Sequence, residues 1–275
     1  MADRTTPTTQ SPQQQAFRLE RVGHVAELVL DRADRRNPLD YAAVLELVGH
    51  LESLDVTPDV GCILLRGDGT GFCSGGDLSE FQTARGASAF EFHDGGAGWA
   101  RLMTMIPKMR VPVVVAAHGY ALAGGCGIVA AADIAVAAET TAFGVSEVRI
   151  GLFPIVVLPA LQRAIGHRRA RELALTGRRI NAAEASAIGL VHRVFPDETF
   201  VEDARALATD IASLGADALR LGKQLLDTIA DLPFDQATAH SQAVRGTFMS
   251  TPDFAEGVAS FLEKRRPVFR STIAT

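Results

Sequence analysis

Three short apolar runs limit the folds that this chain can adopt. They cover residues 60–65, 113–117 and 134–137 and consist almost wholly of Val, Ile, Leu and Ala. Unbroken apolar runs of this length are typical of strands that are buried on both faces, as in a parallel sheet. Apolar residues at helical spacing follow Pro38, at Val44, Leu47, Val48, Leu51 and Leu54. The alternation of strand and helix therefore predicts an α/β layered core with parallel strands.

Further elements are predicted before and between these strands. Residues 17–20 and 25–30 fit two strands joined by a turn. The pair Asn37-Pro38 marks a helix start, because proline suits the first helical turn. Polarity rises and glycine clusters over residues 76–111, which predicts a mobile loop that leads into a helix over 99–105.

The last third of the chain has a different character. After Gly177 the pattern is helical almost throughout, most clearly over residues 182–188, 200–214, 216–229 and 254–264. Residues 1–15 contain Thr, Gln, Pro and Ser without an apolar core, which predicts a disordered N-terminal arm. We therefore expect three parts: the arm 1–15, a catalytic core 16–200, and a helical C-terminal region 201–275.

Charge and cysteine content exclude several classes of protein. The formal net charge of −5 argues against nucleic-acid binding, which needs a basic face. The chain lacks both a signal-peptide pattern and an unbroken apolar stretch long enough to span a bilayer. Its three cysteines form no CxxC pair, so a disulfide framework is not expected. A cytoplasmic protein that contacts neither nucleic acid nor membrane is predicted.

Two glycine-rich turns carry the strongest functional signal. Residues 72–78 (FCSGGDL) and 118–127 (HGYALAGGCG) each follow a strand-like run. Glycine lets backbone N–H groups approach a ligand without a Cβ in the way, and two such turns facing each other aim two donors at one oxygen. Downstream, Glu147 has mostly apolar neighbours, which raise the pKa of a carboxyl and suit it to proton transfer. This combination predicts enolate chemistry on a carbonyl compound.

Other familiar motifs are incomplete. Residues 67–71 (GDGTG) follow a strand, but Phe72 stands where a dinucleotide-binding loop needs its third glycine. Phe72 also replaces the leading glycine of a serine hydrolase GxSxG. The chain has neither a P-loop lysine motif nor a zinc-type Cys/His set, so no metal is expected. Cys73 as a nucleophile beside His118 or His93 is a minor alternative.

Several candidate residues have a structural alternative. Arg149 would pair with Glu147 if that carboxylate were an ordinary surface residue. Asp77 and Asp133 suit helix caps or turns. His118 lies at a strand end before glycine, where a structural histidine is common.

Seven segments, in order along the chain, resemble the enoyl-CoA hydratase/isomerase (crotonase) superfamily. They are residues 72–78, 119–127, 132–134, 143–151, 173–177, 185–191 and 261–266. The resemblance extends from about Phe17 to the C-terminus. It implies an α/β fold, a crotonase-like spiral of ββα units with a helical C-terminal trimerisation region. A homotrimer or hexamer is the assembly it implies.

The resemblance also implies roles for individual residues. The backbone N–H groups of Gly76 and Gly124 correspond to the oxyanion donors, and Gly124 is expected to open a helix whose dipole adds to the stabilisation. Glu147 corresponds to a catalytic acid/base glutamate. Ser74 occupies the place whose carbonyl holds the adenine of coenzyme A.

The substrate follows from the same resemblance. Asp77 and Lys264 are further candidates for contacts with coenzyme A. The expected substrate is an acyl-CoA, so coenzyme A enters as part of the substrate and no separate cofactor is required.

The chain departs from the family pattern at two places. Hydratases of the family carry a glutamate directly after Gly-Gly-Cys, where this chain has Gly127, and the loop after Pro154 reads IVVL instead of being rich in glycine. With one carboxylate, proton transfer between two carbons is simpler than hydration. The expected activity is that of an enoyl-CoA hydratase or a Δ3,Δ2-enoyl-CoA isomerase. The alternatives are a non-catalytic acyl-CoA-binding protein, or thioester hydrolysis, decarboxylation or ring opening, with Ser146, Arg149 or His118 supplying another polar group.

Overall fold

A six-stranded sheet forms the centre of the computed structural model, which describes residues 15–83, 86 and 88–269. The first strand pairs antiparallel and the other pairings are parallel. The strand order is β1 (Phe17–Val22), β2 (Val25–Leu30), β4 (Cys62–Gly67), β6 (Val113–Ala117), β8 (Ile134–Ala138) and β11 (Arg193–Phe195). The three apolar runs of the sequence form three of the four interior strands, β4, β6 and β8, as predicted.

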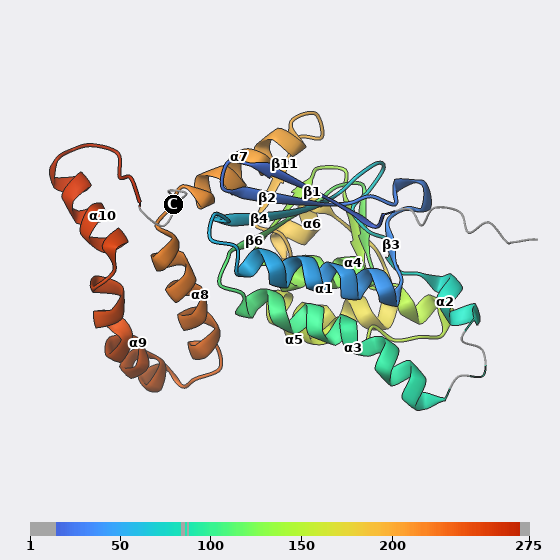
Figure 1. Ribbon diagram of the computed structural model, residues 1–275. Helices are drawn as coiled ribbons and strands as arrows, with labels where there is room; N and C mark the ends of the chain where they lie inside the picture. The colour runs from blue at the N-terminus through green and yellow to red at the C-terminus, as the bar shows by residue number, and fades with distance from the viewer. Residues whose placement is uncertain (1–14, 84–85, 87, 270–275) are drawn as a thin grey trace, which may run out of the picture.

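Helices cover both faces of this sheet (Figure 1). Ile63 and Leu65 of β4 point to the larger core, whereas Cys62 and Leu64 point to a smaller core under the opposite face. The larger core is covered by α1 (Tyr41–Asp55), α3 (Ala89–Met105), α4 (Gly124–Ala131) and α5 (Leu158–Thr176). The smaller core is closed by α7 (Phe200–Ala212). Burial on both faces explains why these strands are continuously apolar.

Short strands branch from the main sheet in a regular way. Each central strand is followed by a short strand and then a helix, which gives the units β2-β3-α1, β4-β5-α3, β6-β7-α4 and β8-β9-α5. The short strands form two small sheets of their own. They are β3 (Pro38–Leu39), β5 (Gly75–Gly76), β7 (Tyr120–Leu122), β9 (Ala142–Gly144) and β10 (Ile180–Asn181). The predicted spiral of ββα units is confirmed.

Two helix boundaries differ from the prediction. Pro38 lies in strand β3, and α1 begins at Tyr41 because the side chain of Asp40 caps the helix by accepting from Ala43 N. The glycine cluster expected in a mobile loop lies inside α3, which begins at Ala89 with a capping box between Ser88 and Glu91. Before it, residues 78–83 form the short helix α2 (Leu78–Thr83).

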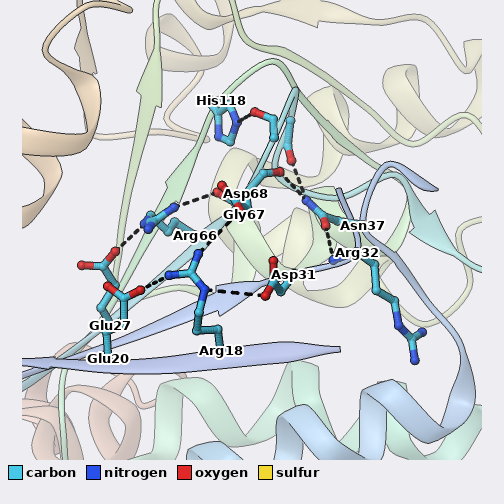
Figure 2. A network of polar contacts seen from close by, with 12 residues as sticks. Arg18, Glu20, Glu27, Asp31, Arg32, Asn37, Arg66, Gly67, Asp68 and His118 are labelled. Atoms are coloured by element: carbon cyan, nitrogen blue, oxygen red, sulfur yellow. Dashed lines mark hydrogen bonds and ion pairs between the residues drawn. The ribbon is translucent and has the colours of Figure 1, made fainter. Parts of the chain in front are cut away.

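A buried ion-pair network joins strands β2 and β4 and also reaches helix α7; Figure 2 shows its contacts around Arg18, Glu27 and Arg66. Glu27 of β2 is fully buried and accepts hydrogen bonds from Arg66 of β4 and from Arg205 of α7. Burial opposes ionisation of Glu27, but the bonds from Arg205 and Arg66 hold its pKa below the ordinary value. Arg18 joins Glu20 and Asp31 nearby, at the more exposed edge of the network.

The C-terminal helices form a lobe beside the sheet, on the side away from α2 (Figure 1). They are α8 (Ala216–Ile229), α9 (Phe234–Met249) and α10 (Pro252–Leu262). Lys223 of α8 holds the lobe to the core: it is buried and its Nζ donates to Asp133 Oδ2 at 2.6 Å. Helix α7 packs on the sheet, so the lobe begins at α8. The division between a catalytic core 16–200 and a helical C-terminal region 201–275 stays a prediction. The predicted arm 1–15 lies almost wholly outside the described residues.

Candidate active site

The two glycine-rich turns lie side by side. Cys73 N donates to the Tyr120 carbonyl at 3.2 Å, and Leu122 N donates to the Cys73 carbonyl at 3.0 Å. Farther along, a Cβ built on Gly75 would lie 2.7 Å from the Ala123 Cβ and 3.3 Å from Gly124 N. Only glycine permits this approach, and Gly75 also has a φ of +102°. The chain therefore brings residues 75–76 directly against the start of α4.

The N–H of Gly76 faces away from strand β3. Asp77 N donates to the Leu39 carbonyl of β3 at 3.1 Å. Successive N–H groups of an extended strand point to opposite edges. Since Asp77 N faces β3, Gly76 N faces the other edge, along which residues 121–124 run.

The second turn passes into α4 through a strained residue. Ala123 has a φ of 49° and a ψ of −121°, and its N–H donates to the Gly144 carbonyl at 2.8 Å. This conformation is costly for a residue with a Cβ. It lets α4 begin at Gly124, as the sequence predicts, so that the Gly124 N–H is among those with no partner inside the helix. The positive end of the helix dipole lies at the same place.

Glu147 approaches α4 from a third segment. It opens a short 3-10 helix, Glu147–Ile150, three residues after Gly144. Burial together with the charge of Glu147 raises the pKa of the Cys126 thiol to about 12, so the carboxylate acts on the first turn of α4. The Gly75–Gly76 turn therefore lies against the start of α4, and Glu147 is close enough to Cys126 for its charge to act on that helix turn.

The carboxyl of Glu147 is poorly solvated. Its Oε2 atom is buried and has no hydrogen-bond partner among the described residues. Burial raises the pKa of Glu147 above its ordinary value of 4.5, and a bond from its own backbone offsets this in part. Arg149 does not neutralise it: its Nε donates to the Gly177 carbonyl at 2.8 Å. A buried carboxyl oxygen without a partner costs stability, which makes Glu147 a candidate for a functional rather than a structural role.

Three other candidates have structural partners. His118 Nε2 lies 2.9 Å from the Gly69 carbonyl, and its ring packs against Phe200, in agreement with a structural role. Cys73 is fully buried, and burial raises its pKa to about 12, so the thiolate that a nucleophile needs is disfavoured. Asp77 pairs with Arg35 Nη2 at 2.6 Å and accepts from Ser79 N, which is the geometry of a cap on α2.

The expected coenzyme A contacts are not all in one place. Ser74 is half-buried in the first turn, where its N–H donates to the Arg36 carbonyl at 3.1 Å. Lys264 comes two residues after the end of α10, and α10 lies in the C-terminal lobe, on the far side of the molecule from α2 (Figure 1). Within a single chain Lys264 is not brought to the site.

Apolar side chains fill the place beside Gly127. A Cβ at this position would lie 2.4 Å from Val157 Cγ1 and 3.1 Å from Met103 Sδ. One helical turn earlier, a Cβ at Gly124 would lie 2.3 Å from the ring of Trp99. Sequence motifs did not single out Trp99 or Met103; their spacing on one helix face is the signal that could have found them.

Among residues 15–83, 86 and 88–269, no group of three His, Cys, Asp or Glu side chains is arranged to hold a metal ion. Within the same residues, no helix combines the length and the apolar character needed to cross a membrane.

Comparison with known proteins identifies the family. Residues 20–272 match the family model described as enoyl-CoA hydratase/isomerase. The rat protein named enoyl-CoA hydratase domain-containing protein 3, mitochondrial, is 34% identical over 89% of this chain and 81% of its own. The crystal structure of an enoyl-CoA hydratase from Mycobacterium smegmatis superposes with a TM-score of 0.88 at 30% identity, covering 93% of this chain and 99% of that chain.

A second solved structure agrees. The enoyl-CoA hydratase from Bacillus anthracis superposes with a TM-score of 0.87 at 31% identity, covering 94% of this chain and all of that one. The fold and these likenesses confirm the resemblance found in the sequence. The chain belongs to the enoyl-CoA hydratase/isomerase (crotonase) superfamily and is an enzyme of that type.

Proposed function

We propose that this enzyme moves a proton between two carbons of an acyl-CoA thioester, as a Δ3,Δ2-enoyl-CoA isomerase does. The observation that carries the proposal is the buried carboxyl of Glu147, whose Oε2 has no partner among the described residues and whose pKa is raised. A base of this kind gains from taking a proton, because protonation removes its buried charge.

The thioester oxygen would lie between the N–H groups of Gly76 and Gly124. Proton loss at C2 turns the thioester into an enolate whose negative charge concentrates on that oxygen. Each N–H donor aimed at it contributes about 3 kcal/mol to transition-state stabilisation. The approach of Gly75 to Gly124 N and the start of α4 at Gly124 support this arrangement.

Glu147 would perform both proton transfers. As carboxylate it takes a proton from C2 of a 3-enoyl-CoA, and the electron pair of the C–H bond enters a dienolate extending to C4. As carboxylic acid it returns the same proton at C4, which leaves a double bond between C2 and C3. No atom is gained or lost.

Hydration is the less favoured reaction because the second carboxylate is replaced by apolar atoms. At Gly127 the family pattern of hydratases has a glutamate, and here Val157 and Met103 fill the space beside that position. Water held between two carboxylates has no place there. This packing favours isomerisation over water addition.

The remaining expectations belong to the same proposal. The substrate is an acyl-CoA, with the adenine near the Ser74 carbonyl and no additional cofactor. Asp77 is committed to Arg35 and Ser79, so its contact with coenzyme A would be indirect. Lys264 would reach coenzyme A only from a neighbouring subunit. A cytoplasmic location, inferred from three cysteines that are all free and buried, stays a prediction.

Isotope labelling tests the reaction. The protein is incubated in heavy water with a 2-enoyl-CoA, and separately with a 3-enoyl-CoA, and the products are analysed by mass spectrometry. We expect conversion of the 3-enoyl-CoA to its 2-isomer without addition of water. Glu147→Gln should lower kcat by at least about a thousandfold and leave the dissociation constant of a saturated acyl-CoA within about threefold.

Three results would overturn the proposal or part of it. Full turnover by Glu147→Gln would remove Glu147 from the mechanism. Formation of the 3-hydroxyacyl-CoA as the main product would identify a hydratase. Binding of acyl-CoA with no reaction on either substrate would favour the non-catalytic alternative.

A further inference from the structure

A cavity of about 650 Å³ lies at the far end of α4 from the proposed oxyanion site. Its apolar wall includes Val129, Ala130, Val156 and Ala160. Charged residues at its edge include Lys108, Asp133, Arg163 and Asp227; Asp133 pairs with Lys223 of α8 at 2.6 Å, and Arg163 pairs with Asp227 at 3.9 Å. A cavity of this size with an apolar wall suits an apolar ligand.

Helices α3 and α4 connect this cavity to the proposed active site. Trp99 packs on Gly124, and Met103, one turn further along α3, packs on Gly127. Beyond them, Pro107 and Ala130 line the cavity. The two helices therefore run side by side from the oxyanion site toward the cavity.

Met103 lies between the first turns of α4 and the cavity. Its Sδ lies 3.1 Å from the position of a Cβ on Gly127, and the same residue lines the cavity. Val157 closes the other side, but its β-branched side chain at the start of α5 is stiff. Met103 is unbranched and has three rotatable side-chain bonds, so it can move aside without a shift of the backbone.

We infer that the acyl chain of the substrate passes along the contact between α3 and α4, displaces the side chain of Met103 and ends in this cavity. The inference rests on the proposed acyl-CoA site and adds its chain-length preference. Ala130 lies six residues along α4 from Gly124, roughly 9 Å at the rise of an α-helix. A six-carbon chain ends short of that distance, whereas a ten-carbon chain enters the cavity.

Binding of saturated acyl-CoA esters tests this without requiring turnover. Dissociation constants of hexanoyl-CoA and decanoyl-CoA are measured by calorimetry. Each buried methylene strengthens binding by roughly fourfold, so the wild-type protein should bind decanoyl-CoA at least about tenfold more tightly. Met103→Phe should remove this advantage by filling the passage, and Met103→Ala should keep or increase it.

Two further variants make the test decisive. Met105→Phe, on the same helix but outside the cavity wall, is the control and should keep the wild-type ratio. Ala130→Leu, at a partly buried position, fills the cavity itself and should reduce the ratio even if Met103→Phe does not fold. Equal binding of the two esters by the wild-type protein, or an unchanged ratio in both Met103→Phe and Ala130→Leu, overturns the inference.

The outcome is separable from that of the proposed reaction. If no 3-enoyl-CoA is isomerised but the binding ratio responds to Met103 as expected, the reaction is wrong and the acyl path stands. If 3-hexenoyl-CoA and 3-decenoyl-CoA are both isomerised but the ratio ignores Met103, the reaction stands and the path is wrong.

Discussion

Glu147 is a residue whose surroundings oppose its charge. Its Oε2 is buried without a partner among the described residues, and its pKa is raised by burial. The apolar neighbours along the sequence were sufficient to predict a raised pKa. They did not reveal that Arg149 turns away to the Gly177 carbonyl, because that contact joins residues 28 positions apart.

The raised pKa of Glu147 has a sign that experiment can check. The folded pKa lies above the unfolded value of 4.5, so the folded state favours the protonated carboxyl. The free energy of unfolding therefore falls as pH rises from 4.5 through the folded pKa. The loss is about 1.4 kcal/mol for every tenfold increase in the proton affinity of the Glu147 carboxyl on folding. Glu147→Gln cannot ionise and should escape this loss. In urea unfolding, the free energy of unfolding of Glu147→Gln relative to that of the wild-type protein should be higher at pH 8 than at pH 5.

The same property predicts the pH dependence of the proposed reaction. If Glu147 abstracts the proton as its carboxylate, kcat/KM should fall as pH drops through the folded pKa, at a pH above 4.5. For the urea experiment, an equal difference in unfolding free energy between Glu147→Gln and the wild-type protein at pH 5 and at pH 8 would contradict the raised pKa of Glu147.

Gly127 marks the limit of sequence-based prediction at the scale of a residue. The sequence showed that a carboxylate is missing there. The space beside Gly127 is filled by Met103 and Val157, which lie 24 and 30 positions away in the sequence. No local sequence pattern encodes packing between segments so far apart. The strained φ of Ala123 is likewise imposed by its neighbours, since Ala123 N must reach Gly144.

At the scale of elements, local patterns predicted strands well and helix starts less well. The apolar runs identified β4, β6 and β8 because these strands are buried on both faces. Three glycines argued against a helix over residues 95–98, yet Ser88 caps α3 and the buried face of Trp99, Leu102 and Met103 holds it on the core. Tertiary packing overrides the low helix propensity of glycine here.

Helix α8 depends on one buried charge. Lys223 Nζ donates to the carbonyls of Ile106 and Val111 at 3.1 and 3.0 Å, and to Asp133 Oδ2. Burial raises the pKa of Asp133 although the ammonium of Lys223 opposes the rise. The pair is therefore a point where α8 and the core are fixed to each other.

Breaking this pair should loosen the C-terminal lobe. Lys223→Met leaves the partly buried Asp133 without its cation and should cost about 3–5 kcal/mol in the free energy of unfolding, measured with urea. Asp133→Asn combined with Lys223→Met removes both charges and should recover part of the loss. Lys108→Met, at an exposed lysine, is the control. A loss as small as that of the control would show that the ion pair does not hold α8.

At the scale of the whole molecule, the C-terminal lobe exposes apolar surface. Phe234 is 88% exposed and Phe261 82% exposed, and Leu226, Leu262 and Val268 are also exposed. Exposed patches of this kind mark interfaces. The core, by contrast, is complete without the lobe, since both faces of the main sheet are already covered.

Assembly into trimers is the prediction that follows from this surface together with the position of Lys264. Since the lobe lies away from α2 in its own chain, Lys264 can contact a coenzyme A bound near Ser74 only if the lobe reaches a neighbouring subunit (Figure 1). Light scattering after size-exclusion chromatography should give three or six times the 29.2 kDa of one chain. Phe261→Asp should shift this mass toward a single chain and weaken acyl-CoA binding in parallel, because a charge is buried where the apolar ring was.

A matched substitution separates the two effects of that variant. Gln242→Asp adds the same charge at an exposed polar position of α9 and should leave both mass and affinity unchanged. If Phe261→Asp dissociates the assembly but binds acyl-CoA as tightly as the wild-type protein, the lobe serves assembly alone and Lys264 has no part in binding. If the wild-type protein has the mass of one chain, the exposed aromatic residues of α9 and α10 serve another partner. Parallel loss of mass and affinity is the result that a site completed by a neighbouring subunit requires.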